Sequence, residues 1–205
     1  MSEKLEFDQL ELDAIGEVSN ICLGTGATSL GMLTRQVIDI TPPKTKILNR
    51  GDVIKENKEK KVFVKVTYVV GIEGCSMLVL NVDDAKMIAD MMMGSDGHGD
   101  FYKMDFNEMH ISAISEAMNQ MMGAAATSMS TMLNKKTDIS TPETEYMEKG
   151  TYISHEFPND ERFVEIGFHM KIGEDIDIRT YQLFPHDLAK AISDLFLIKK
   201  ANKQI

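Results

Sequence analysis

An internal repeat constrains this chain more than any other feature of its sequence. When the sequence is displaced by 99 residues, residues 13–43 align without a gap with residues 112–142, and eleven of these 31 positions are identical. Segments that match more loosely are 62–70 with 162–172, and 83–92 with 186–196. Such a repeat indicates two copies of one supersecondary unit. Each copy has only about half of the 205 residues, so we expect the two to share one hydrophobic core.

Hydrophobic patterning divides each copy into a long helix, strands and a shorter helix. Helical spacing of apolar residues predicts helices over residues 10–35, 83–93, 105–132 and 185–199. Alternation of apolar and polar residues predicts strands over residues 37–40, 61–70, 74–81, 161–172 and 176–184.

These elements predict an α+β fold with an antiparallel sheet and two long helices on one face. We expect residues 1–205 to form a single domain made of two repeats related by a pseudo-two-fold axis. The repeats cover about residues 10–95 and 105–200, and the glycine-rich stretch 94–100 joins them.

Composition narrows the class of partner. The formal net charge is −10 and no basic stripe is visible along the chain, so nucleic acid is not an expected partner. The basic pairs at 135–136 and 199–200 are interpreted as solvated surface, and Cys22 and Cys75 as small buried apolar residues. No run approaches the ~18 apolar residues that span a bilayer, so we expect no transmembrane segment and a cytoplasmic protein.

Both long helices present a carboxylate and a carboxamide one turn apart. At about 100° per residue, Asp13, Glu17 and Asn20 fall on one face of the first helix. The equivalent residues of the second helix are Ser112, Glu116 and Asn119. Asn is no general base, but its carboxamide can orient a water through one donor and one acceptor. The alternative interpretation is a solvated face, followed by small residues that let the helices pack closely.

Two other patterns suggest sites and have simpler explanations. Residues 23–31 read LGTGATSLG, which lacks the lysine of a phosphate loop, so we interpret them as a helix-packing segment. Asp96, His98 and Asp100 lie in the glycine-rich stretch with the other histidines scattered, so we expect no metal site. Residues 81–84 are interpreted as a helix cap in which Asp83 is the capping residue.

The spacing around the Glu/Asn pairs is the signature of a known family. The CheC/CheX/FliY phosphatases carry Asp or Ser, three residues, Glu, two residues, Asn, twenty-two residues and Pro. The chain resembles this pattern twice, at Asp13, Glu17, Asn20 and Pro43, and at Ser112, Glu116, Asn119 and Pro142. Residues 111–142 look like the FliY branch in particular, and the resemblance covers nearly the whole chain.

The resemblance implies a phosphatase that removes the aspartyl phosphate from the chemotaxis response regulator CheY. It implies that Asn20 and Asn119 orient the attacking water, and that Glu17 and Glu116 bond a lysine of the regulator. No cofactor is expected in this chain, because Mg²⁺ is held by CheY. The implied partners are phosphorylated CheY and the flagellar switch proteins FliM, FliN and FliG, at the C-ring on the cytoplasmic face of the membrane.

Two alternatives to this function stay open. The chain could be a non-catalytic switch scaffold that binds phosphorylated CheY, or a stand-alone CheC-type regulator linked to receptor deamidation. FliY proteins usually carry a C-terminal FliN-like switch domain, and we expect none in this chain.

Overall fold

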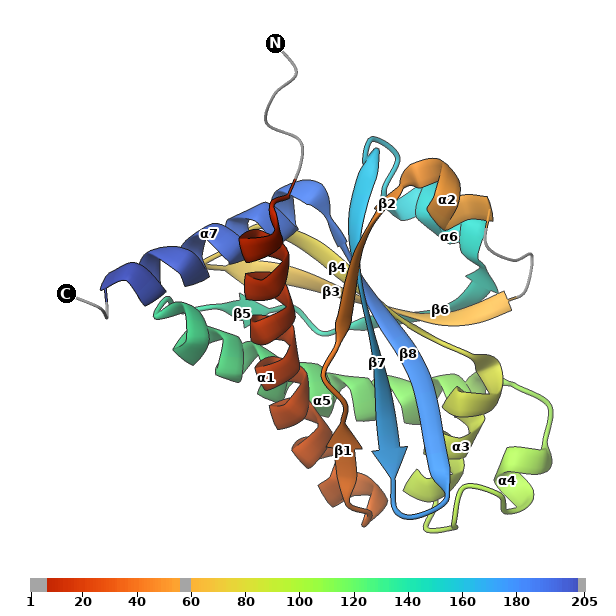
Figure 1. Cartoon of the computed structure of the whole chain (residues 1–205). Helices are drawn as coiled ribbons and strands as arrows, with labels where there is room; N and C mark the ends of the chain where they lie inside the picture. The colour runs from red at the N-terminus through yellow and green to blue at the C-terminus, as the bar shows by residue number, and fades with distance from the viewer. Residues whose placement is uncertain (1–6, 56–59, 203–205) are drawn as a thin grey trace.

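The computed structural model describes residues 7–55 and 60–202, and it shows one order of elements twice (Figure 1). The first half contains α1 (Gln9–Thr34), β1 (Ile38–Ile40), β2 (Lys44–Asn49), α2 (Arg50–Lys55), β3 (Lys60–Val70), β4 (Gly74–Leu80) and α3 (Val82–Met92). After a short α4 (Asp100–Lys103), the second half contains α5 (Glu108–Leu133), β5 (Asp138–Ile139), β6 (Glu143–Glu148), α6 (Lys149–Glu156), β7 (Arg162–Ile172), β8 (Ile176–Pro185) and α7 (His186–Asn202). The predicted repeat is confirmed, whereas β2, β5, β6 and the short helices α2, α4 and α6 were not predicted.

All eight strands join one antiparallel sheet in which the halves exchange strands. The main path runs β1-β7-β8-β4-β3-β5, with β2 also on β7 and β6 also on β3. Lys44 of β2 lies opposite Gly167 of β7, and Glu143 of β6 lies opposite Lys65 of β3. The pair β4 and β8 joins the halves at the centre of the sheet. The predicted α+β fold with one shared antiparallel sheet is therefore confirmed.

The proline of each sequence signature lies at the point where the chain crosses to the other half. Pro43 directly precedes β2 and Pro142 directly precedes β6. Proline cannot continue a helix, and it favours an extended residue before it. Equivalent backbone bonds anchor both crossings, from Thr41 N–H to the His169 carbonyl and from Ser140 N–H to the Thr67 carbonyl. The signature proline thus has a structural role in strand exchange.

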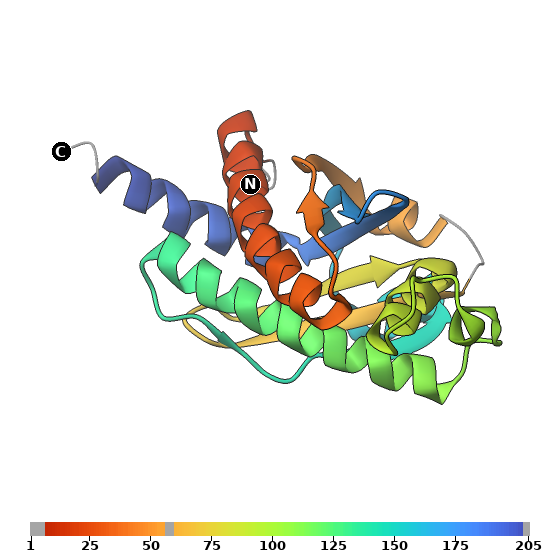
Figure 2. The same cartoon turned by 90° about the horizontal axis from the view of Figure 1, so that it is seen from below.

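Helices α1 and α5 cross on one face of the sheet, as predicted (Figure 2). Their crossing depends on Gly26, because a Cβ added there would lie 2.7 Å from the Met121 carbonyl oxygen. The core beneath them includes Ile15, Val18 and Ile114, which are fully buried. A smaller apolar cluster lies on the opposite face, where α2 and α6 cover it; its large members include Phe63, Tyr152, Phe157 and Phe163.

The starts of two helices differ from prediction. Helix α5 begins at Glu108, three residues after the predicted start, because Asn107 caps it and accepts from Met109 N–H. The buried His110 accepts the Asn107 N–H in return. Asp83 does not cap α3; Asn81 holds the cap position, and its carboxamide donates to Asp84.

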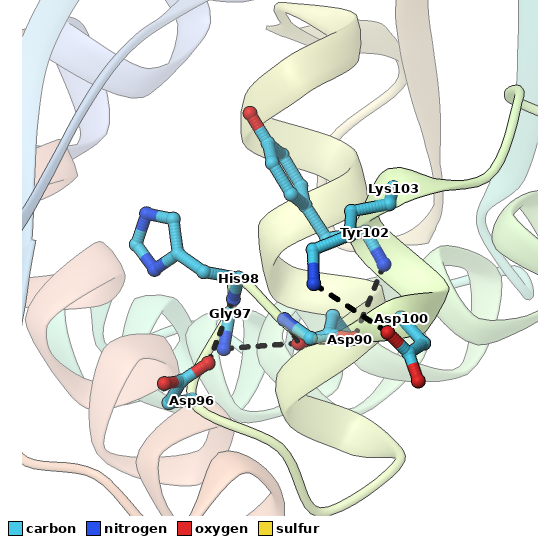
Figure 3. Close-up of polar contacts among 8 residues, drawn as sticks. Asp90, Asp96, Gly97, His98, Asp100, Tyr102 and Lys103 are labelled. Atoms are coloured by element: carbon cyan, nitrogen blue, oxygen red, sulfur yellow. Dashed lines mark hydrogen bonds and ion pairs between the residues drawn. The ribbon is translucent and has the colours of Figure 1, made fainter.

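A buried carboxylate organises the glycine-rich join between the halves (Figure 3). Asp90, at the end of α3, is 1% exposed and accepts the backbone N–H groups of Gly97, Gly99 and Tyr102 at 2.9–3.1 Å. Burial alone would raise the pKa of Asp90, but these bonds together with one from Ser95 lower it below its ordinary value. The join is therefore an ordered turn built around one anion.

Two glycines two residues apart on α1 are expected to respond oppositely to alanine. At Gly26 the new methyl group collides with backbone of α5, so Gly26→Ala should lower the free energy of unfolding by about 1–3 kcal/mol. Gly24 has open space around it, so Gly24→Ala should raise that energy by about 0.5–1 kcal/mol through helix propensity. Urea unfolding followed by circular dichroism measures both; equal shifts would contradict the proposed crossing.

Replacing Asp90 by Asn should cost about 2–3 kcal/mol of unfolding free energy at pH 7, because a carboxamide cannot accept all of these bonds. Since folding lowers this pKa, the carboxylate stabilises the fold above the pKa of the unfolded state, about 3.9, and loses this effect as the pH falls through the folded value. The difference in unfolding free energy between wild type and the Asp90→Asn variant should therefore shrink below about pH 4. Asp96→Asn, at an exposed loop position, is the matched control and should change stability little.

Candidate functional site

The first Glu/Asn pair lies on the outer surface of α1. The Glu17 side chain is 47% exposed, Asn20 is half-buried, and both follow the fully buried Ile15 by less than two turns. Glu17 Oε2 lies 3.2 Å from Nζ of Lys200 in the last turn of α7. Lys200 is exposed, which agrees with its interpretation as solvated surface, but the sequence did not predict its contact with Glu17, which arises because α7 packs beside α1.

The second pair lies on α5 and has different surroundings. Glu116 and Asn119 are both exposed, and Glu116 accepts only a bond of 3.1 Å from Gln120, one turn further on the same helix. Within residues 7–55 and 60–202, neither the Asn20 nor the Asn119 carboxamide has a hydrogen-bond partner. Each amide can therefore offer a donor and an acceptor to one water.

One turn after each asparagine, the helix surface is flat. A Cβ added at Gly24 or at Gly123 would meet no heavy atom within 4 Å. Gly24 also lines a shallow depression of about 540 Å³ between α1 and α5, together with Thr28 and Ala124. Other small residues of the predicted stripes pack inward, because Ala27 and Ala126 are buried. Close helix packing therefore explains part of each stripe, and the glycines leave room for a partner beside each pair.

The supporting residues of the signature divide into two kinds. Asp13 and Ser112 are exposed one turn before the glutamates, and Asp13 accepts a bond of 2.8 Å from Gln9. Pro43 and Pro142 lie at the strand crossings and not beside the asparagines in the chain. The structure thus gives the prolines a folding role and keeps the polar members on the helix surface.

Other candidate sites have structural explanations. The segment 23–31 lies inside α1, which confirms the helical interpretation and places its packing contact at Gly26. In the part of the chain described, no three His, Cys, Asp or Glu side chains come together as metal ligands. Asp96, His98 and Asp100 point in different directions around the loop (Figure 3).

The cysteines offer no activated nucleophile. Cys22 is buried between α1 and α5, as predicted, and burial raises its pKa to about 12, although a bond with Ser128 opposes this. Cys75 is only partly buried, and burial raises its pKa as well. Among the described helices, none is long and apolar enough to cross a membrane.

This geometry suits a reaction that a partner completes. The two pairs lie on exposed helix surface and not in an enclosed cleft, so an electrophile must be brought to them by another molecule. A carboxamide can place a water in line with an activated phosphoryl group, where positioning and charge stabilisation account for most of the catalysis. A carboxylate beside it can bond a cation of the partner and fix the register.

Comparison with known proteins identifies the family. The sequence profile of the CheC-like family matches residues 10–47 and 109–146, which contain both signatures. The chain is 42% identical over 204 residues to the flagellar motor switch phosphatase FliY of Bacillus subtilis strain 168; the match covers 97% of this chain. The chain spans 53% of the length of that relative.

Solved structures agree with this assignment. The crystal structure of Thermotoga maritima FliY matches with a TM-score of 0.83 and 33% identity, covering 94% of this chain and 98% of that one. The FliM middle domain from H. pylori has a TM-score of 0.66 at 12% identity, covering 92% and 99%, which shows a shared fold alone. The chain therefore belongs to the CheC-like family, as a FliY-type member.

Proposed function

We propose that this chain hydrolyses the aspartyl phosphate of the response regulator CheY. The observation that carries the proposal is the doubled, solvent-facing Glu/Asn pair, present on both long helices with open surface one turn further on. The Bacillus relative is named a flagellar motor switch phosphatase, which supports the same chemistry for this chain. An acyl phosphate is already activated, so an oriented water is sufficient and no covalent nucleophile is required.

The side chains have separate roles in this proposal. Asn20 and Asn119 each hold a water in line with the phosphorus atom. Glu17 and Glu116 each bond a lysine of the regulator and thereby orient it on the helix. The regulator supplies Mg²⁺, and the residues described here form no cluster of metal ligands of their own.

A second function is a switch scaffold that binds phosphorylated CheY without hydrolysis. It is favoured by one observation, namely that the FliM middle domain has the same fold. We propose that the chain works with the switch proteins FliM, FliN and FliG at the cytoplasmic face of the motor, as its resemblance to FliY implies; the Bacillus relative is named for the flagellar motor switch.

Removing the two carboxamides tests the phosphatase. The loss of phosphate from labelled CheY should be accelerated by wild type, and Asn20→Ala or Asn119→Ala should each remove part of that acceleration. A single positioned water contact contributes up to about 10²-fold per site, so the double variant should retain almost none. Phosphate release at saturating regulator measures the effect.

Asn49→Ala is the matched control, because it removes an exposed carboxamide at the end of β2, outside the long helices. It should leave the rate unchanged. If wild type binds phosphorylated CheY but gives no acceleration, the scaffold function replaces the phosphatase.

Lys200 should weaken the first site, because its ammonium already pairs with the carboxylate proposed to bond the regulator. In an Asn119→Ala background, Lys200→Ala should raise kcat/KM by about two- to fivefold, as expected for an exposed ion pair. The same substitution in an Asn20→Ala background should have little effect. Lys135→Ala is the charge-matched control, and an equal gain in both backgrounds would contradict the pairing.

A further inference from the structure

A basic groove lies on the sheet face that the long helices do not cover. Its volume is about 1010 Å³, and it is formed by β2, β7, β8 and the segment before β2. Its cationic side chains are Lys44, Lys46, Lys171 and Arg179. Only two carboxylates, Glu165 and Asp177, line it. This excess of positive charge lies on a chain whose formal net charge is −10.

Strand geometry explains why these residues share one face. Side chains alternate between the faces of a strand, and on β7 the residues Ile166, Phe168 and Met170 belong to the core beneath α1 and α5. The residues of β7 that alternate with these three, among them Glu165 and His169, therefore point to the other face. Helices α2 and α6 lie at one end of that face (Figure 1). The groove residues lie mainly on β2, β7 and β8 and include none from these two helices.

Most of the groove cations are not neutralised within the chain. Lys46 Nζ lies 3.0 Å from the nearly buried carboxylate of Glu165, and Asp177 is engaged by His169 at 3.2 Å. Lys44, Lys171 and Arg179 are exposed and form no ion pair with any residue that the structure describes. In the sheet register Lys171 lies between Asp39 of β1 and Asp177 of β8. It is therefore a weaker cationic site than Lys44 and Arg179, which lie opposite Gly167 and His169.

The floor of the groove is open at its centre. Gly167 lies opposite Lys44 on one side and Tyr181 on the other. A Cβ at Gly167 would meet nothing closer than the Lys44 carbonyl oxygen at 3.9 Å. Lys44 and Arg179 lie on strands that flank β7, so about 10 Å separates them. Lys171 lies four residues further along β7 than Gly167, so the cations follow the length of the groove, as successive acidic side chains of one extended chain would.

The charge is specific to one half of the repeat. The positions equivalent to Lys44 and Lys46 on β6 are Glu143 and Glu145. On that side, Lys65 is already paired with Glu156 at 2.6 Å and lies 3.8 Å from Glu143. The two halves share a fold but carry opposite charge on equivalent strands, so the fold itself does not require these lysines.

We propose that this groove binds an extended acidic segment of a partner protein, on the face opposite the Glu/Asn pairs. Lys44, Lys171 and Arg179 pair with successive carboxylates of that segment, and Gly167 lets its backbone approach the sheet. Charge complementarity of this kind favours fast, salt-dependent association. The surface is separate from the helix surface assigned to the phosphatase, so both can be occupied together.

The test uses a fluorescein-labelled twelve-residue peptide of alternating Glu and Ser, which places its carboxylates on one side when extended. Fluorescence anisotropy should show saturable binding to the full chain at low salt, lost at high salt. The K44E/K171E/R179E variant should bind about tenfold or more weakly. The control K103E/K135E/K136E carries the same charge change at exposed positions outside the groove and should bind within about twofold of wild type.

Several outcomes would overturn the proposal. Wild type could fail to bind the peptide, or the two triple variants could lose affinity equally. If wild type self-associates at low salt in sedimentation and the groove variant stays monomeric, the occupant is a second copy of this chain. A twelve-residue oligothymidylate could bind wild type more tightly than the peptide does. If the groove variant also fails to bind it, the ligand of the groove is nucleic acid. Circular dichroism of each variant establishes that it is folded.

Discussion

The exchange of strands between the two halves is the interaction on which the rest of the structure depends. β2 completes the sheet of the second half and β6 completes that of the first, so neither repeat has its own full set of backbone partners. Unpaired strand edges are costly or prone to aggregation, and half of the chain cannot bury a core of sufficient size. The long helices α1 and α5 are held against the sheet between these crossings, which fixes the faces that carry the Glu/Asn pairs.

The pairs are similar in sequence but not in environment. Glu17 faces a lysine of α7, whereas Glu116 bonds only with a glutamine of its own helix. Duplication therefore produced two sites with the same chemical groups and different competition for the carboxylate. Both lie on exposed helix surface, so the proposed reaction needs an electrophile presented by a partner. This explains why the described residues provide neither an enclosed cleft around the pairs nor a metal cluster.

The opposite face of the sheet carries residues different from those that meet the long helices. Strand alternation separates the two, since residues that point to the helices form the core and their neighbours in sequence point away. On this second face the repeat symmetry is broken by charge, with lysines on β2 and glutamates on β6. A single sheet thus carries the helices with the Glu/Asn pairs on one side and a charged groove on the other.

The sequence by itself determined the repeat, the α+β class, the long helices and the Glu/Asn signature, because periodicity and motif spacing are local properties of the chain. It did not reveal β2, β5 and β6, which are short and lack clear alternation; they are strands because the other half pairs with them. Nor did it reveal that Lys200 reaches Glu17, or that lysines from β2, β7 and β8 gather into one groove. These residues are far apart along the chain, and only tertiary packing decides which charges become neighbours.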